Sequence, residues 1–106
     1  MLLARVIGNV VSTQKDGAMQ GQKLLLLRPL LVDETGSFRP GPTTIVAVDS
    51  LGAGEGETVL FCQGSSARQA AGMLNLPVDA VVTGIVDNVD VNNRTIYPEP
   101  SKSAKS

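Results

Sequence analysis

The sequence predicts a mainly β fold, a small OB-like barrel that carries one short helix. Segments with period-two alternation and many β-branched residues recur along the 106 residues. Turns rich in glycine and proline separate these segments, and only one stretch has helical composition. A chain of this length forms one domain with a single core. The helix follows the fourth strand, one strand later than is usual in OB barrels.

The first two strands are predicted over residues 2–13 and 23–32. Residues 2–13 alternate with apolar residues on both faces, and Gly8 predicts a bulge or a sharp bend, as a barrel requires. Residues 23–32 are apolar on both faces around four consecutive leucines. Because Pro29 has no N–H group for a strand ladder, it is expected at an edge or near a strand end.

Two further strands are predicted in the middle of the chain. Residues 33–36 have the composition of a turn, and residues 38–42, with two prolines and a glycine, are expected to extend that turn. The third strand is predicted over residues 43–49, which are rich in β-branched residues, and the fourth over residues 57–63.

One short helix is predicted after the fourth strand. Ser66 is a suitable N-cap, and Gln69 stands three residues later, which is the spacing of a capping box. The alanine-rich residues that follow favour a helix. Asn75 and Pro77 are expected to end it.

A long fifth strand is predicted over residues 78–91, followed by a turn at Asn92-Asn93 and a closing strand over residues 94–97. Residues 98–106 form a polar tail without apolar periodicity, which we expect to be mobile. The predicted organisation is therefore one domain over residues 1–97 and a flexible tail after it.

The outside of the predicted barrel presents a solvation problem. A barrel needs only its inner face to be apolar, but the first, second and fifth predicted strands are apolar on both faces. Charged residues make up only 18% of the chain, against 42% apolar residues, and one short helix cannot cover the remainder. We therefore expect the outer face to pack against further copies of the same chain.

The loop between the third and fourth predicted strands contains Gly52, Gly54 and Gly56. A phosphate-binding loop would carry a lysine and lead into a helix. This loop leads into a strand, and Glu55 and Glu57 would repel phosphate. Glycine suits a backbone that another chain approaches closely. The loop is either a tight strand connection or a segment crowded around a symmetry axis.

The side chains that catalysis and metal binding need are scarce. The chain has no histidine, which excludes Ser-His-Asp and Cys-His arrangements. Cys62 is expected to pack as a small apolar residue, and a single cysteine allows no intrachain disulfide. The pairing of Ser12 with Lys15 is too common to indicate catalysis. We expect no metal or cofactor, because the acidic candidates lack a calcium-loop spacing and fit solvated turns: Asp33, Glu34, Asp87 and Asp90.

Nucleic acid and membranes are not expected as partners. The net charge is -1, and aromatic residues are only 3% of the chain. An OB barrel that binds single strands uses a basic groove and aromatic stacking platforms. No apolar run approaches the roughly 20 residues that span a bilayer. The apolar N-terminus alternates as a strand does and lacks the basic start of a signal peptide.

Five separated segments carry a more specific signal: residues 8–15 (GNVVSTQK), 21–26 (GQKLLL), 47–57 (AVDSLGAGEGE), 64–69 (GSSARQ) and 77–87 (PVDAVVTGIVD). In this order and at these distances they resemble the pentameric vertex proteins of bacterial microcompartments, the EutN/CcmL family. The resemblance covers about residues 1–97, nearly all of the part expected to be structured.

The resemblance implies a homopentamer, an OB-related barrel in a ring of five that caps the vertices of an icosahedral shell in the bacterial cytoplasm. Such proteins are not enzymes, and hexameric and pseudohexameric shell proteins tile the facets around them. If a narrow pore follows the fivefold axis, the expected lining is the glycine-rich loop, through Ser50, Leu51, Gly52, Ala53 and Gly54. For contacts with neighbouring subunits or shell proteins, the hypothesis names Lys15, Lys23 and Arg68.

Two questions stay open at the level of sequence. Residues 37–44 are nearer in length to metabolosome members than to carboxysome members, so the type of compartment is not fixed. The alternative function is an OB-type module that binds single-stranded nucleic acid, which a salt-dependent shift of a labelled oligonucleotide would reveal.

Overall fold

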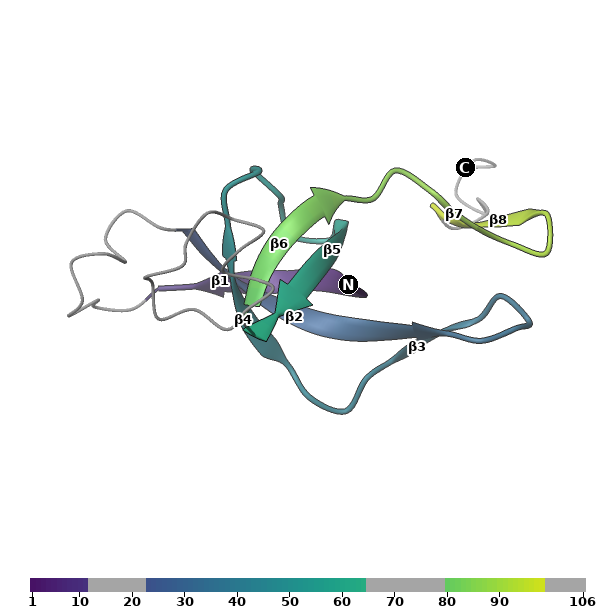
Figure 1. Ribbon diagram of the computed structural model, residues 1–106, viewed down its shortest axis with the longest axis horizontal. Coiled ribbons are helices and arrows are strands. Elements are labelled where there is room, and N and C mark those ends of the chain that lie inside the picture. Colours follow the sequence, from purple (N-terminus) through teal and green to yellow (C-terminus); the bar gives the residue numbers. More distant parts are fainter. Residues whose placement is uncertain (12–22, 65–79, 99–106) are drawn as a thin grey trace, which may run out of the picture.

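The computed structural model describes residues 1–11, 23–64 and 80–98, and within them the chain forms eight β-strands (Figure 1). The predicted helix over residues 66–74 lies outside the described residues, as does the tail from residue 99 onward. In the part described, no helix is long and apolar enough to cross a membrane.

Five strands form a closed barrel. Its order is β1 (Leu2–Val10), β5 (Thr58–Gln63), β6 (Ala80–Ile85), β4 (Ile45–Asp49) and β2 (Lys23–Val32), and β2 pairs again with β1. The β4–β6 pairing is parallel and the other pairings are antiparallel. The predicted OB-like barrel is thus confirmed for the strands that the structure describes.

The barrel interior is filled by alternate residues of all five strands. Phe61, Leu25 and Leu27 are the largest fully buried side chains in it. Burying one such side chain contributes about 1.5–3 kcal/mol relative to leaving it exposed. The same core cluster includes smaller neighbours that let the strands approach: Ala4, Val6, Ala47, Ala53, Val59, Ala80 and Val82.

The bulge predicted at Gly8 is confirmed. The β1–β2 register shifts between Val6, which is paired with Leu27, and Gly8, which is paired with Leu26. An extra residue in one strand bends that strand and raises its twist, which helps a five-stranded sheet close on itself.

Two hairpins project from the barrel toward the same side of Figure 1 and lengthen the molecule to 48 × 28 × 23 Å. One joins the end of β2 to β3 (Phe38–Pro40), and the other is formed by β7 (Val89–Val91) and β8 (Arg94–Tyr97). Two hydrogen bonds connect the turns of these hairpins. Asn92 Nδ2 donates to the Glu34 carbonyl oxygen at 2.7 Å, and Arg94 Nη2 donates to the Thr35 carbonyl oxygen at 2.8 Å.

Several predicted strand boundaries are confirmed. The second strand has the predicted bounds, 23–32, and the closing strand covers 94–97 as predicted. The third begins at Ile45 rather than residue 43, and the fourth begins at Thr58 rather than residue 57. The predicted turn at Asn92-Asn93 is also confirmed, since both residues have positive φ, 51° and 64°, as a type I′ hairpin turn requires.

Two predictions are wrong. Residues 38–42 do not simply extend a turn, because Phe38–Pro40 pairs with Leu30–Val32 as β3. Pro40 is tolerated there because β3 is an edge strand. The single strand predicted over residues 78–91 is two strands, β6 and β7. After the Val86 N–H donates to the Thr58 carbonyl oxygen, the chain leaves the barrel and continues to the outer hairpin.

Candidate functional site

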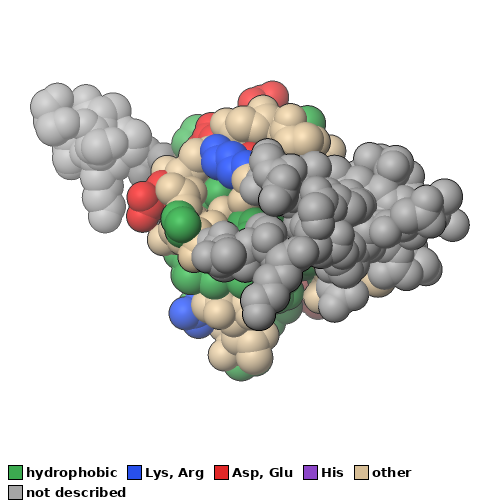
Figure 2. All heavy atoms as spheres, turned by 90° about the vertical axis from the view of Figure 1, so that its left-hand side faces the viewer, with side chains coloured by type: hydrophobic (Ala, Val, Ile, Leu, Met, Phe, Trp, Pro, Cys, Tyr) green, Lys and Arg blue, Asp and Glu red, His purple; other side chains and the backbone are tan. Residues whose placement is uncertain are grey.

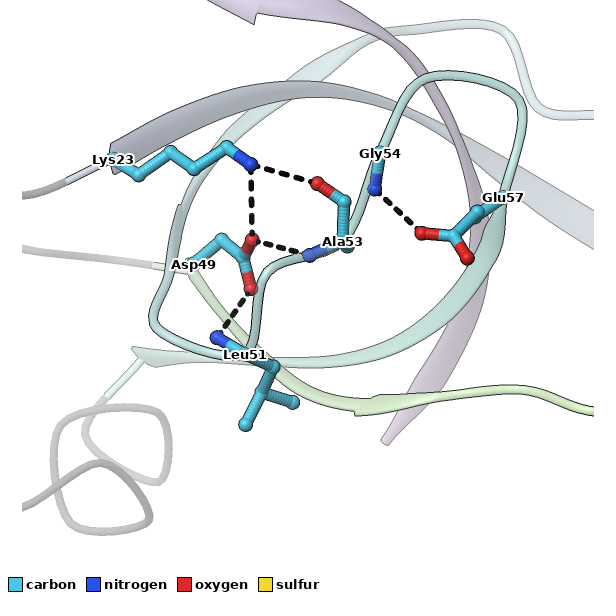
Figure 3. Close-up of polar contacts among 6 residues, drawn as sticks. All are labelled: Lys23, Asp49, Leu51, Ala53, Gly54 and Glu57. Carbon is cyan, nitrogen blue, oxygen red and sulfur yellow. Dashed lines mark hydrogen bonds and ion pairs between the residues drawn. The ribbon is translucent and has the colours of Figure 1, made fainter.

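The glycine-rich loop is organised by Asp49, the last residue of β4, which is only 3% exposed (Figure 3). Its Oδ1 accepts a hydrogen bond from the Leu51 N–H at 2.9 Å, and its Oδ2 accepts one from the Ala53 N–H at 2.8 Å. A carboxylate that accepts two backbone N–H groups fixes the direction in which the chain leaves the strand. This single side chain therefore shapes the first half of the loop.

Lys23 completes the arrangement from the neighbouring strand. It is the first residue of β2 and the register partner of Asp49. Its Nζ lies 3.8 Å from Asp49 Oδ2 and donates a hydrogen bond to the Ala53 carbonyl oxygen at 2.8 Å (Figure 3). The ammonium group thus balances a buried carboxylate and binds the loop backbone, while 47% of its side chain stays exposed.

The second half of the loop is held against β1. The Glu57 carboxylate accepts a hydrogen bond from the Gly54 N–H, and the Glu57 N–H donates to the Gly54 carbonyl oxygen at 3.1 Å. Two more bonds reach Val6, whose carbonyl oxygen accepts from the Gly56 N–H at 2.8 Å and whose N–H donates to the Glu57 carbonyl oxygen at 2.9 Å. The loop is therefore a fixed part of the barrel rim.

Gly52 and Gly56 are required by backbone conformation. Their φ angles are +86° and +90°, which side chains with a Cβ adopt only with strain. A Cβ added at either position would meet no atom within 4 Å in the described part of the chain. Among the described residues, these two glycines are therefore required by their backbone conformation and not by a close neighbour.

The structure divides the five predicted pore residues into two groups. Ser50, Leu51 and Gly52 are exposed, and Leu51 is 48% accessible. Gly54 is half-buried, and Ala53 is fully buried in the barrel core. The Ala53 side chain therefore faces its own subunit and cannot line an opening, which corrects that part of the hypothesis.

Of the three predicted interface residues, the structure describes only Lys23. Lys23 makes its polar contacts within its own subunit, as described above. Lys15 and Arg68 lie outside the described residues. Sequence reasoning missed Asp49 as the residue that organises the loop. An aspartate at a strand end before a serine and glycines is a known signal for a side-chain-to-backbone turn, and it could have indicated this role.

A second polar turn closes the β2–β3 hairpin. Asp33 Oδ1 accepts hydrogen bonds from the Thr35 hydroxyl at 2.6 Å and from the N–H groups of Thr35 and Ser37, both at 3.0 Å. These bonds, the hydroxyl bond foremost, lower the pKa of the Asp33 carboxyl below its ordinary value of 3.8. A groove of about 500 Å³ lies between this turn and β8, lined by Phe38, Arg94 and Ile96 among others.

The described residues show no cluster of side chains suited to metal binding. Within residues 1–11, 23–64 and 80–98, no three Asp, Glu or Cys side chains gather as metal ligands would. Cys62 is half-buried on β5. The geometry of the site therefore supports a structural loop on a barrel rim.

Comparison with known proteins places the chain in a family. The family model described as ethanolamine utilisation protein EutN/carboxysome matches residues 1–87. The carboxysome shell vertex protein CcmL of Gloeobacter violaceus is 54% identical over 97 residues, covering 92% of this chain and 93% of the relative. The microcompartment shell vertex protein PduN of Salmonella typhimurium is 50% identical over 91 residues, covering 84% and 98%. The chain belongs to the EutN/CcmL family.

Solved structures agree with this assignment. The structure of Gloeobacter violaceus CcmL superposes with a TM-score of 0.78, covering 92% of this chain and 96% of that one. The pentameric microcompartment shell protein GrpN from Rhodospirillum rubrum superposes with a TM-score of 0.71 at 44% identity, covering 86% and 99%.

Proposed function

We propose that this chain is a structural shell protein whose homopentamers cap the vertices of an icosahedral bacterial microcompartment in the cytoplasm. Membership of the EutN/CcmL family supports this function, because relatives about half identical to the chain are named shell vertex proteins. A relative of the same fold is described as pentameric. The resemblance noted from the five sequence segments is thus confirmed at the level of family.

The observation that carries the proposal is the apolar outer surface of the barrel. In the single subunit, large hydrophobic side chains remain exposed, among them Val46 at 48% and Ile7 at 37%. Figure 2 shows hydrophobic side chains at the surface between scattered charged groups. An exposed apolar surface of this kind marks an interaction site. A ring of identical subunits covers it by a heterologous contact that closes on itself.

The exposed part of the glycine-rich loop is proposed to face the fivefold axis. Ser50, Leu51 and Gly52 are the three predicted pore residues whose side chains or backbone remain open to solvent. The loop backbone is fixed by Asp49 and Lys23, so five copies would present a rigid and narrow rim. Ala53 is not part of this lining because it packs in the core.

The proposed neighbours are the hexameric and pseudohexameric shell proteins that tile facets around such vertices. No catalytic activity or cofactor is included in the proposal. The named relatives include proteins of carboxysomes and of other microcompartments, and they therefore do not select one type of compartment. Binding of single-stranded nucleic acid, the alternative function, has no observation in its favour among the described residues or the comparisons.

Electron cryomicroscopy of shells purified with and without this chain tests the proposal. With the chain present, we expect fivefold density of five subunits at each vertex. Without it, we expect gaps at the vertices while the facets remain. Vertices that look the same in both preparations would contradict the function, even if the isolated protein were a pentamer.

A further inference from the structure

Two arginines stand directly opposite each other on the outer wall of the barrel. Arg5 of β1 and Arg28 of β2 are register partners, so their side chains share one face of the sheet. Their neighbours Ala4, Val6 and Leu27 are fully buried, and the arginines therefore lie on the outward face. Like charges directly opposite in a sheet are destabilising. The isolated subunit thus carries a repulsive pair on its surface.

The polar groups beside this pair also lack partners in the described part of the chain. Arg5 Nε is buried and makes no hydrogen bond there. Thr58, the register partner of Arg5 on the other side, is fully buried, and its hydroxyl is likewise unbonded. Arg28 makes one bond, from Nη1 to the Gly41 carbonyl oxygen at 3.3 Å. Buried polar groups are almost always hydrogen-bonded, so the described residues leave this part of the barrel wall incompletely paired.

An exposed apolar row lies next to the arginines. Gly8 pairs with Leu26, and Leu26 pairs with Val46, which places these residues in line across β1, β2 and β4. Val46 is 48% exposed, and Ile7, at the bulge, is 37% exposed. We call this surface the arginine face; it consists of Arg5, Arg28, Ile7, Leu26 and Val46.

Charge and symmetry indicate that another copy of this chain binds the arginine face. In a closed ring of five, each contact is heterologous, so the arginine face meets a different face of the next copy and never itself. Among the described residues the only ion pair is Lys23 with Asp49, and the carboxylates of Glu34, Glu55, Asp87 and Asp90 are exposed. The same chain therefore offers both the cationic surface and exposed carboxylates to complement it, of which Asp90 already accepts hydrogen bonds from Asn88 and Thr95.

We propose that the arginine face is one side of the subunit contact and that Arg5 and Arg28 bind a carboxylate of the next copy of this chain. This inference rests on the proposed pentamer. A carboxylate between two guanidinium groups removes their repulsion and accepts charge-assisted hydrogen bonds. The apolar row is buried by the same contact.

Native mass spectrometry of charge-reversal variants tests the inference. In the double variant R5E/R28E, we expect at least a hundredfold weaker pentamer. The matched variant R39E, on the exposed edge strand β3, should stay pentameric. A second pair of variants makes the same comparison for the apolar row. The V46D pentamer should dissociate, whereas the pentamer of T43D, in the exposed loop before β4, should not. Pentamers of R5E/R28E and V46D as stable as wild type would overturn the inference and leave the proposed function standing.

Arginine modification of the unaltered protein covers the case in which these variants do not fold. Phenylglyoxal should modify the exposed Arg39 and Arg94 at least tenfold faster than Arg28, which is half-exposed in the single subunit but covered in the proposed contact. Equal rates at Arg28 and Arg39 in the wild-type pentamer would contradict the inference. A wild-type protein that is not a pentamer would instead contradict the proposed function on which it rests.

Discussion

The Lys23 ammonium group lies 3.8 Å from Asp49 Oδ2, across the first register pair of β2 and β4. Asp49 is almost wholly buried, whereas nearly half of the Lys23 side chain is exposed. The pair connects the barrel wall to the loop because each partner also binds the loop backbone.

Replacing Asp49 is expected to loosen the loop. D49A removes the acceptor for the Leu51 and Ala53 N–H groups and leaves Lys23 without its partner. We expect a loss of about 1–3 kcal/mol in the free energy of unfolding, the usual result of leaving such groups unsatisfied. Hydrogen exchange at both amides should become much faster. Unchanged exchange at Leu51 and Ala53 would mean that the carboxylate does not hold the loop.

Replacing Lys23 is expected to have a smaller effect. Because its side chain is partly exposed, K23A should cost about 1 kcal/mol or less in unfolding free energy. The pentamer should persist, since the polar contacts of Lys23 lie within its own subunit. If K23A dissociates the pentamer in analytical ultracentrifugation while the fold is retained, Lys23 acts at the interface after all.

Two neighbouring loop positions should respond in different ways. A53L places a larger side chain in a packed core and should cost about 1–3 kcal/mol in folding stability. L51E changes an exposed side chain and should leave the barrel intact. If five copies of residue 51 meet at the axis, L51E should weaken the pentamer most at low salt, where like charges repel over a longer range. A salt-independent L51E pentamer of wild-type stability would place Leu51 away from the axis.

The turn at Asp33 makes a pH-dependent contribution. Its pKa is lowered in the folded chain, so the carboxylate stabilises the fold at pH values above the unfolded value of 3.8. That stabilisation is lost as the pH falls through the folded pKa. In an NMR titration, the Asp33 carboxyl should therefore have a midpoint below 3.8, and the T35A variant should move it upward. A midpoint unaffected by T35A would show that the Thr35 hydroxyl is not the cause.

The C-terminal residues give a simple negative prediction. Residues 98–106 were predicted to form a polar tail, and removal of residues 101–106 is expected to leave the pentamer intact. Size-exclusion chromatography of the shortened chain checks this. Loss of the pentamer would show that the tail binds a neighbouring subunit.

Strands whose apolar pattern coincides with their pairing could be predicted from the sequence. The bounds of residues 23–32 follow from a leucine-rich run between polar segments. The break between β6 and β7 could not be predicted, because valines continue on both sides of it. Strand β6 ends where its antiparallel partner β5 begins, at Thr58, and this depends on tertiary pairing. For the same reason β3 was missed, since Phe38–Pro40 becomes a strand only beside Leu30–Val32.

The sequence predicted a special loop at the glycine-rich segment but not the contacts that shape it. The glycine-rich segment indicated a special loop, and positive φ at Gly52 and Gly56 confirms that two of its glycines are conformationally required. The burial of Ala53 and the role of Asp49 depend on which way the loop folds over the barrel. The opposition of Arg5 and Arg28 depends on strand register, which the bulge before Gly8 shifts. None of these three properties can be predicted from local composition.

Native mass spectrometry across a dilution series tests the central claim most directly, that the apolar outer wall of this barrel is covered by sibling subunits. We expect a single species of five times the 11.0 kDa chain, unchanged as the protein is diluted from high to low micromolar concentration. A folded 11.0 kDa monomer that persists throughout the same series would contradict the account.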